Sequence, residues 1–141
     1  MIQWCVDAWM ERKQYFKRRL ENLGEDYITD WSFTYTDIVK ILFEEVINPY
    51  VEDHDDFIEG YDLDRMTIID DGEYQGTLIF AIPEDVYQPC ADEYLFTHNY
   101  YGSCSGCDTL MRAQGLEYNM CIQDIMTIAL NLVENLRQLY D

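Results

Sequence analysis

Apolar residues recur at helical spacing near both ends of the chain. Over residues 2–23 they return every three or four positions, which predicts an amphipathic helix that stops at Gly24. A second helix is predicted with Thr36 as its N-cap, and Pro49 is expected to end or kink it. Residues 118–140 show the same periodicity and predict a long final helix.

The middle of the chain has the pattern of β-strands. Residues 66–70 and 74–82 are rich in β-branched and aromatic side chains, and they flank the dipeptide Asp71-Gly72, which suits a tight hairpin turn. Residues 93–101 predict a third strand beside the second. The pattern therefore predicts a small three-stranded antiparallel sheet.

Two shorter helices complete the prediction, an acidic one over residues 51–59 and another over residues 107–114. Helices before and after an antiparallel sheet indicate an α+β fold, in which the sheet packs with the N-terminal and C-terminal helices. No repeat, linker or change of composition divides the chain, so residues 1–141 are expected to form a single domain.

The chain is strongly acidic, with 28 Asp and Glu residues against 9 Lys and Arg residues and a formal net charge of −19. Such a charge repels nucleic acid and anionic membranes, so neither is expected as a direct partner. Hydrophobic residues make up 48% of the chain and aromatic residues 15%, which indicates a folded protein because disordered acidic chains are poor in both. The charge favours a basic partner.

Most of the charge lies in residues 44–85, where 14 acidic residues stand against Arg65 alone. Carboxylates spread over a surface can imitate the phosphates of duplex DNA, which carries one charge per about 1.7 Å of its axis. The distribution thus predicts a flank that occupies a basic nucleic-acid-binding site, although charge runs without any partner are common. The residues expected to bind the partner are Glu44, Glu45, Glu52, Asp53, Asp55, Asp56, Glu59, Asp62 and Asp64.

The same acidic stretch does not fit an EF-hand calcium loop. That loop needs a glycine at its sixth position, but the sixth residue is Ile58 when counted from Asp53 and Thr67 when counted from Asp62. No cofactor is therefore predicted from this part of the chain.

Five cysteines are present, and the first residues do not combine a basic segment with an apolar one. A secretory signal is therefore not expected, and no apolar run approaches the roughly 20 residues of a membrane span. These features predict a cytoplasmic protein with reduced thiols, in which a Cys-x-x-Cys motif indicates a metal site, a redox site or a structural turn.

The stretch YGSCSGCDTL places Cys104 and Cys107 between a predicted strand and a predicted helix. In a redox site, the helix N-terminus would lower the pKa of Cys104, and Cys107 would be the resolving thiol. In a zinc site, the two thiolates would need further ligands. The candidate zinc ligands are Cys90, His98, Cys104 and Cys107.

The third interpretation of this stretch is a structural corner without chemistry. Gly102 and Gly106 would permit tight backbone geometry, and Ser103 or Ser105 would cap the following helix. The two cysteines would then be buried as compact hydrophobic side chains. The sequence alone leaves the redox, zinc and structural interpretations open.

The corner sequence YGSCSGCDTL, with YQGTLIFAIP before it and MTIALNLVENL after it, resembles a group of small bacteriophage proteins of unknown function. The resemblance covers roughly residues 74–136. It implies a phage origin and action in the cytoplasm of an infected bacterium, and it implies no catalytic residues. Because small acidic phage proteins often resemble inhibitors of host nucleases or CRISPR effectors, it strengthens the hypothesis of DNA mimicry.

Motifs typical of enzymes are not found in the sequence. It contains no G-x-S-x-G, no phosphate-binding glycine loop and no H-E-x-x-H, and it has only 2 histidines for general-base chemistry. The leading hypothesis is a non-enzymatic, phage-encoded inhibitor that occludes the basic nucleic-acid-binding site of a host defence protein. The alternatives are a small zinc- or thiol-based protein that uses Cys104 and Cys107, and a structural component of a phage.

Overall fold

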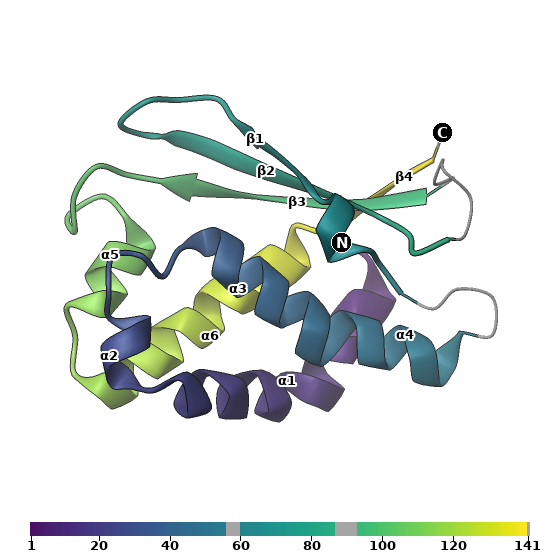
Figure 1. Ribbon diagram of the computed structural model, residues 1–141, viewed down its shortest axis with the longest axis horizontal. Coiled ribbons are helices and arrows are strands. Elements are labelled where there is room, and N and C mark those ends of the chain that lie inside the picture. The colour runs from purple at the N-terminus through teal and green to yellow at the C-terminus, as the bar shows by residue number, and fades with distance from the viewer. Residues whose placement is uncertain (56–59, 87–92, 141) are drawn as a thin grey trace.

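The computed structural model describes residues 1–55, 60–86 and 93–140 of the chain. These residues form a layer of helices and a four-stranded sheet that lies across it (Figure 1). In chain order the elements are α1 (Gln3–Leu23), α2 (Glu25–Ile28), α3 (Tyr35–Leu42), the π-helical turn η1 (Phe43–Ile47), α4 (Asn48–His54), the 3₁₀ turn η2 (Leu63–Arg65), β1 (Thr67–Asp70), β2 (Gly76–Pro83), β3 (Glu93–Tyr101), α5 (Thr109–Gln114), α6 (Tyr118–Glu134) and β4 (Arg137–Tyr140).

The first predicted helix is confirmed as α1. It ends at Gly24, whose φ of +91° lies in the region that glycine adopts most readily. Trp9, Phe16 and Leu20 of its predicted apolar stripe are buried, whereas Met10 is 60% exposed. The four-residue helix α2 follows directly and was not predicted, because so short a segment carries no periodic signal.

The second predicted helix begins two residues earlier than expected, with Thr34 rather than Thr36 as its N-cap. The backbone N–H and the hydroxyl group of Thr34 both donate to the Asp37 carboxylate, at 2.8 and 3.2 Å. Pro49 does not end this helical segment, since it occupies the first turn of α4, where its missing N–H is tolerated. The predicted acidic helix over 51–59 corresponds in part to α4, and residues 56–59 lie outside the described residues.

The α+β class is confirmed, but the sheet has four strands instead of three, in the order β1-β2-β3-β4 with every pair antiparallel. The segment that forms β4 was predicted as the end of the final helix. α6 instead stops at Glu134, and the guanidinium of Arg137 donates to the backbone carbonyls of Glu134 and Leu136 at 3.0 and 2.7 Å. β4 then pairs with β3, a long-range contact that helical periodicity cannot reveal.

The turn between β1 and β2 is longer than the predicted two-residue turn at Asp71-Gly72. Residues 71–75 connect the two strands, and the Asp71 side chain closes the connection by accepting the Thr77 N–H at 2.6 Å. The Asp71 N–H also donates to the Thr77 carbonyl at 3.2 Å, so one backbone and one side-chain hydrogen bond close the connection.

The described helices all lie on one face of the sheet (Figure 1). On that face Phe80, Ile82 and Leu95 are fully buried, and the hydroxyl group of the buried Thr97 donates to the Leu132 carbonyl of α6 at 2.7 Å. Within the described residues, no helix has both the length and the apolar character needed to cross a membrane.

Candidate functional site

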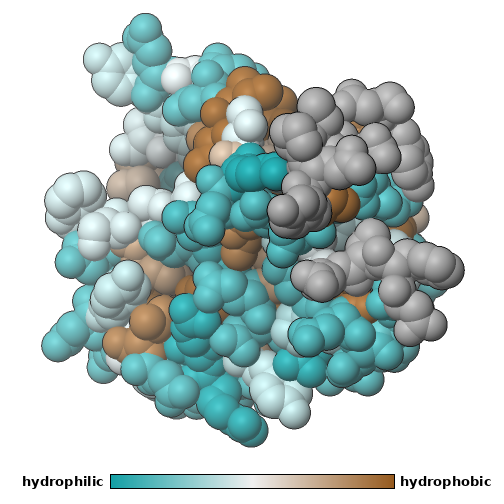
Figure 2. Space-filling view, turned by 45° about the vertical axis from the view of Figure 1, so that its right-hand side comes forward, coloured by the Kyte–Doolittle hydropathy of each residue, from teal (hydrophilic) through white to brown (hydrophobic). Residues whose placement is uncertain are grey.

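The face of the sheet that points away from the helices carries apolar side chains. Ile69 of β1 pairs with Ile79 of β2, and Tyr94 of β3 pairs with Leu139 of β4. Along each strand these residues alternate with those that face the helices, so their side chains point to the opposite side of the sheet. Figure 2 shows apolar side chains on the sheet side of a largely hydrophilic surface. We call this face, defined by its apolar residues, the open sheet face; its members are Ile69, Ile79, Tyr94, Phe96, Tyr100 and Leu139.

The most exposed members of the open sheet face are Ile69, Tyr100 and Leu139, at 51%, 74% and 57%. Contiguous apolar surface of this kind on a small domain often marks a site of interaction with another macromolecule. Aromatic residues such as tyrosine and phenylalanine are also enriched at the centres of protein interfaces. The open sheet face is therefore the strongest candidate for a docking surface.

The acidic residues predicted to bind a partner do not form one continuous row. Glu44 and Glu45 face α1, where Arg19 approaches their carboxylates at 3.4 and 2.9 Å. The remaining residues of the predicted set lie at the end of α4 (Glu52, Asp53 and Asp55), around η2 (Asp62 and Asp64), or outside the described residues (Asp56 and Glu59).

All nine Lys and Arg residues lie in the described part of the chain. Of these cations, only Arg19 and Arg65 pair with a described carboxylate. The exposed carboxylates of Glu52, Asp53 and Glu73 take part in no ion pair with described residues. The molecule therefore keeps a strong negative potential that favours contact with a basic surface.

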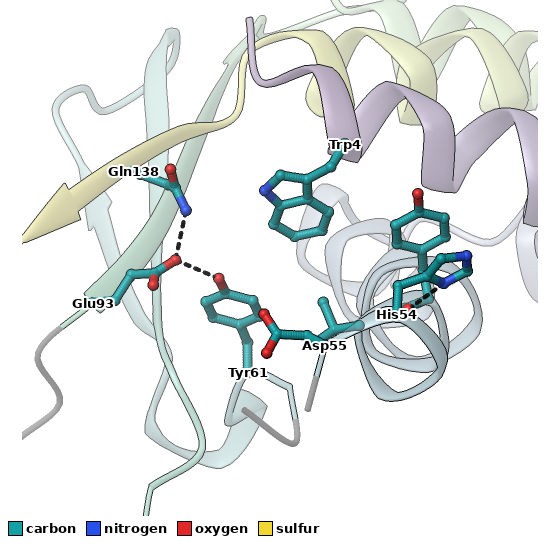
Figure 3. Close-up of a pocket in the computed structure, with 8 residues that line it drawn as sticks. Trp4, His54, Asp55, Tyr61, Glu93 and Gln138 are labelled. Carbon is teal, nitrogen blue, oxygen red and sulfur yellow. Dashed lines mark hydrogen bonds between the residues drawn. The ribbon is translucent and has the colours of Figure 1, made fainter. Parts of the chain in front are cut away.

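A pocket of about 290 Å³ opens where α1, α4, β3 and β4 meet. We call it the Glu93 pocket, and Figure 3 shows its labelled side chains around an open centre, with Trp4 between Glu93 on one side and His54 on the other. The residues that line it are Trp4, Tyr50, Val51, His54, Asp55, Tyr61, Glu93 and Gln138.

Gly60 and Asn48 hold Tyr61 in place in this pocket. The Asn48 side chain accepts the Tyr61 N–H at 2.8 Å and donates to the Tyr61 carbonyl at 3.0 Å. Gly60 has a φ of +133°, and a Cβ atom there would lie 2.9 Å from the Asn48 side chain. Glycine is therefore needed before Tyr61 for both conformation and space.

Two hydrogen bonds fix the carboxylate of Glu93. The Tyr61 hydroxyl group and the Gln138 amide both donate to its Oε1 atom, at 2.6 and 2.7 Å. Burial, together with the nearby Glu93 charge, raises the pKa of Tyr61, and the same two causes raise the pKa of Cys5 to about 12. The pocket therefore contains a fixed negative charge in a partly apolar setting.

The structure contradicts the prediction that Cys104 and Cys107 are buried. Both are exposed, with their Sγ atoms 3.2 Å apart, whereas Cys5 and Cys121 lie in the core. Gly102 permits this arrangement, because a Cβ atom there would lie 2.6 Å from the Cys107 Sγ atom.

The redox hypothesis assigned a lowered pKa to Cys104, whereas the structure lowers the pKa of Cys107. The hydrogen bond with the Cys104 thiol, together with backbone hydrogen bonds, lowers the pKa of Cys107. The helix that follows begins only at Thr109 and has six residues, so both cysteines precede its first turn. The lowered pKa of Cys107 favours its thiolate, which is the nucleophilic form of a cysteine.

Asp108 anchors the corner. It is 5% exposed, and it caps α5 by accepting the Met111 N–H at 2.9 Å, a role that was predicted for Ser103 or Ser105. It also accepts the Gly102 N–H at 2.8 Å and the Tyr35 hydroxyl at 2.9 Å. One carboxylate therefore joins the end of β3, the start of α5 and the start of α3.

The predicted zinc ligands are not brought together by the described residues. Cys104 and Cys107 adjoin, His98 belongs to the outward-pointing positions of β3, and Cys90 lies outside the described residues. No group of three or more potential metal ligands occurs in the part of the chain that the structure describes. The two adjacent thiols alone do not complete the tetrahedral set that structural zinc requires.

Comparison of the chain with known protein families, with curated proteins and with solved structures finds no match. The candidate sites therefore rest on the sequence and the geometry of this molecule.

The Glu93 pocket was not predicted from the sequence. Glu93 was noted only as the start of a strand, and Gln138 was assigned to a helix. No local signal could have identified the pocket, because its walls come from segments at both ends and in the middle of the chain.

We expect Asp108→Ala to lower the free energy of unfolding by about 3 kcal/mol, since it removes a helix cap and leaves buried donors without acceptors. Tyr35→Phe removes one of the three hydrogen bonds to Asp108 and also the acceptor of the Leu110 N–H, and it should cost about 1–2 kcal/mol. Urea unfolding would measure both losses. Asp53→Ala, at an exposed position of α4, is the control and should change stability by less than about 0.5 kcal/mol. A loss below about 1 kcal/mol for Asp108→Ala would contradict this role of the carboxylate.

The thiol pair should react selectively with iodoacetamide. In the native protein we expect Cys104 and Cys107 to be modified, and Cys5 and Cys121 to react only after denaturation. Because the Cys104 hydrogen bond lowers the pKa of Cys107, the rate at Cys107 should rise with pH at a lower midpoint than in the Cys104→Ala variant. Peptide mapping at a series of pH values separates the sites, and equal midpoints would refute the coupling.

Stability should decrease under alkaline conditions. Folding raises the pKa of Cys5 from 9.0 to about 12 and that of Tyr35 from 10.0 to about 12. Both groups therefore stabilise the fold fully at a pH below their pKa in the unfolded chain. This stabilisation is lost progressively as the pH rises above 9.0, because the unfolded chain then releases protons that the folded protein keeps. We expect a loss of about 2 kcal/mol by about pH 10.5 in urea unfolding. Cys5→Ala should be less stable at neutral pH but lose less between about pH 8 and 10.5. An unchanged pH slope in this variant would show that Cys5 does not contribute.

Proposed function

We propose that the protein is a non-enzymatic binding protein that docks its open sheet face and neighbouring carboxylates on a basic surface of another protein. The observation that carries this proposal is the uncovered apolar face of the sheet on a molecule of net charge −19. Apolar contacts at the centre and charge complementarity at the rim are the usual composition of a protein interface.

Charge also selects among the possible occupants of the open sheet face. A second copy of the chain would bring a further net charge of −19 to the interface, and the repulsion would oppose association. A basic partner gains attraction and releases its bound counterions instead. The chain's own charge therefore favours a basic protein over self-association.

We further propose that the basic surface is the nucleic-acid-binding site of a host defence enzyme, such as a nuclease or a CRISPR effector. The resemblance of the corner and its flanking segments to small phage proteins supports this setting. Because the acidic residues lie in separate groups, DNA mimicry is proposed as local charge imitation by each group and not as a continuous row of phosphate-like groups.

Reversing exposed carboxylates of the acidic segment 44–85 should weaken binding to the basic partner. The partner would be isolated from nuclease-treated bacterial lysate and identified, and its affinity measured along a salt gradient with and without duplex DNA. We expect a nucleic-acid-binding enzyme that DNA displaces, and an affinity at least tenfold lower for the triple variant Glu52→Lys, Asp53→Lys and Asp64→Lys.

The matched control is Glu21→Lys, Asp26→Lys and Glu117→Lys, which changes the net charge equally at exposed positions in or beside α1, α2 and α6. It should bind nearly as well as the unchanged protein. Equal weakening by both triple variants would show that only net charge matters. Self-association through the open sheet face, abolished by Tyr100→Asp, would overturn the proposal in favour of an assembly component.

The exposed thiol pair favours a second candidate function, thiol–disulfide exchange. Cys104 borders a groove of about 590 Å³ that is also lined by Trp31 and Met111, and Trp31 is 88% exposed. In such an exchange the Cys107 thiolate would attack a substrate disulfide and Cys104 would resolve the mixed disulfide. One disulfide would form in the protein, and the substrate would leave as two thiols.

A further inference from the structure

The Glu93 pocket is built from rings and a carboxylate in an arrangement that suits a cation. The Trp4 and Tyr50 rings lie nearly parallel, at an interplanar angle of 8° with centroids 6.2 Å apart. The His54 ring stacks on Tyr50 at 13° and 4.0 Å. Faces of aromatic rings attract guanidinium and ammonium groups, and tryptophan does so most strongly.

Glu93 supplies the negative charge opposite these rings (Figure 3). Both hydrogen bonds to its carboxylate end on Oε1, and among the described residues none is made to Oε2. Every Lys and Arg of the chain is described, and none of them pairs with Glu93. The protein therefore holds a fixed, partly buried carboxylate to which it brings no cation of its own.

We propose that the Glu93 pocket receives the guanidinium group of an arginine side chain from the partner protein. This inference rests on the proposed function, because the arginine would belong to the partner's basic surface. A guanidinium is planar and can lie against an aromatic face while its N–H groups donate to the Oε2 atom of Glu93. A volume of about 290 Å³ is below the usual range for drug-sized ligands, and it suits a single side chain.

Arginine fits this chemistry better than lysine. The ammonium group of lysine is compact and strongly hydrated, so it loses more hydration on entry and cannot stack as a plane. Neutral citrulline has nearly the shape of arginine but no charge. The three side chains together separate the contribution of charge from those of shape and stacking.

The test is a titration of the isolated protein with N-acetyl-arginine amide, N-acetyl-lysine amide and N-acetyl-citrulline amide, followed through the tryptophan indole N–H signals by NMR. The three tryptophans provide internal controls, since Trp9 is buried and Trp31 lies in the other groove. We expect the arginine derivative to shift the Trp4 signal in a saturable way, with lysine weaker and citrulline without effect. Binding of lysine as tight as that of arginine, or any saturable binding of citrulline, would overturn the assignment to a guanidinium.

Glu93→Gln is the decisive variant, because glutamine retains an oxygen acceptor for Tyr61 and Gln138 but removes the charge. We expect it to weaken arginine binding at least tenfold. Glu117→Gln changes the net charge equally at an exposed position and should leave binding unchanged. Trp4→Leu offers a second variant should Glu93→Gln fold poorly. Because it removes the Trp4 indole, its titration is followed through the backbone amide signal of Glu93, and it too should weaken arginine binding at least tenfold.

The titration is independent of the capture experiment, so the two proposals can fail separately. If arginine binds at Trp4 but the capture experiment yields no basic partner, the guanidinium site is supported and the proposed function is refuted. If DNA displaces a basic partner whose affinity is unchanged by Glu93→Gln, the proposed function is supported. The proposal that the Glu93 pocket binds an arginine of that partner is then refuted. An equal arginine-induced shift of Trp31 and Trp4 would show unspecific contact of the cation with exposed rings.

Discussion

The burial of one face of the sheet against a single layer of helices is the constraint on which the rest of the structure depends. β2 and β3 place Phe80, Ile82 and Leu95 against the helices, and Thr97 bonds to the Leu132 carbonyl, which joins the sheet to α6. Because side chains alternate along a strand, every inward position fixes an outward one. None of the described helices lies on the outer side, and the outward residues form the open sheet face there. The same packing that builds the core thus leaves the candidate docking surface outside it.

A second consequence of this architecture is the corner after β3. The chain must turn from the sheet into the helical layer, and Asp108 makes the turn possible by accepting hydrogen bonds from Gly102, Tyr35 and Met111. Since the carboxylate occupies the buried side of the turn, the two cysteines point to solvent. The residue that stabilises the corner is therefore not one of those that make its sequence conspicuous, and the thiols are available for chemistry.

Charge is distributed unevenly over the same framework. Arg19 of α1 pairs with Glu44 and Glu45, so part of the acidic segment is neutralised on the helical side. Glu93, at the start of β3, has hydrogen-bond donors but no cation. This contrast separates carboxylates that pair with cations of the chain from a carboxylate that is held by neutral donors alone among the described residues.

The sequence by itself determined the elements whose signals are local: α1, most of α6, the antiparallel strands and the α+β class. It also showed the net charge of −19, since charge is a property of composition. Only the tertiary structure decided that residues 137–140 form β4, that Asp108 anchors the corner and that Trp4, Glu93 and Gln138 share a pocket. Each of these depends on contacts between segments far apart in the chain, and periodicity and propensity describe only neighbours in sequence.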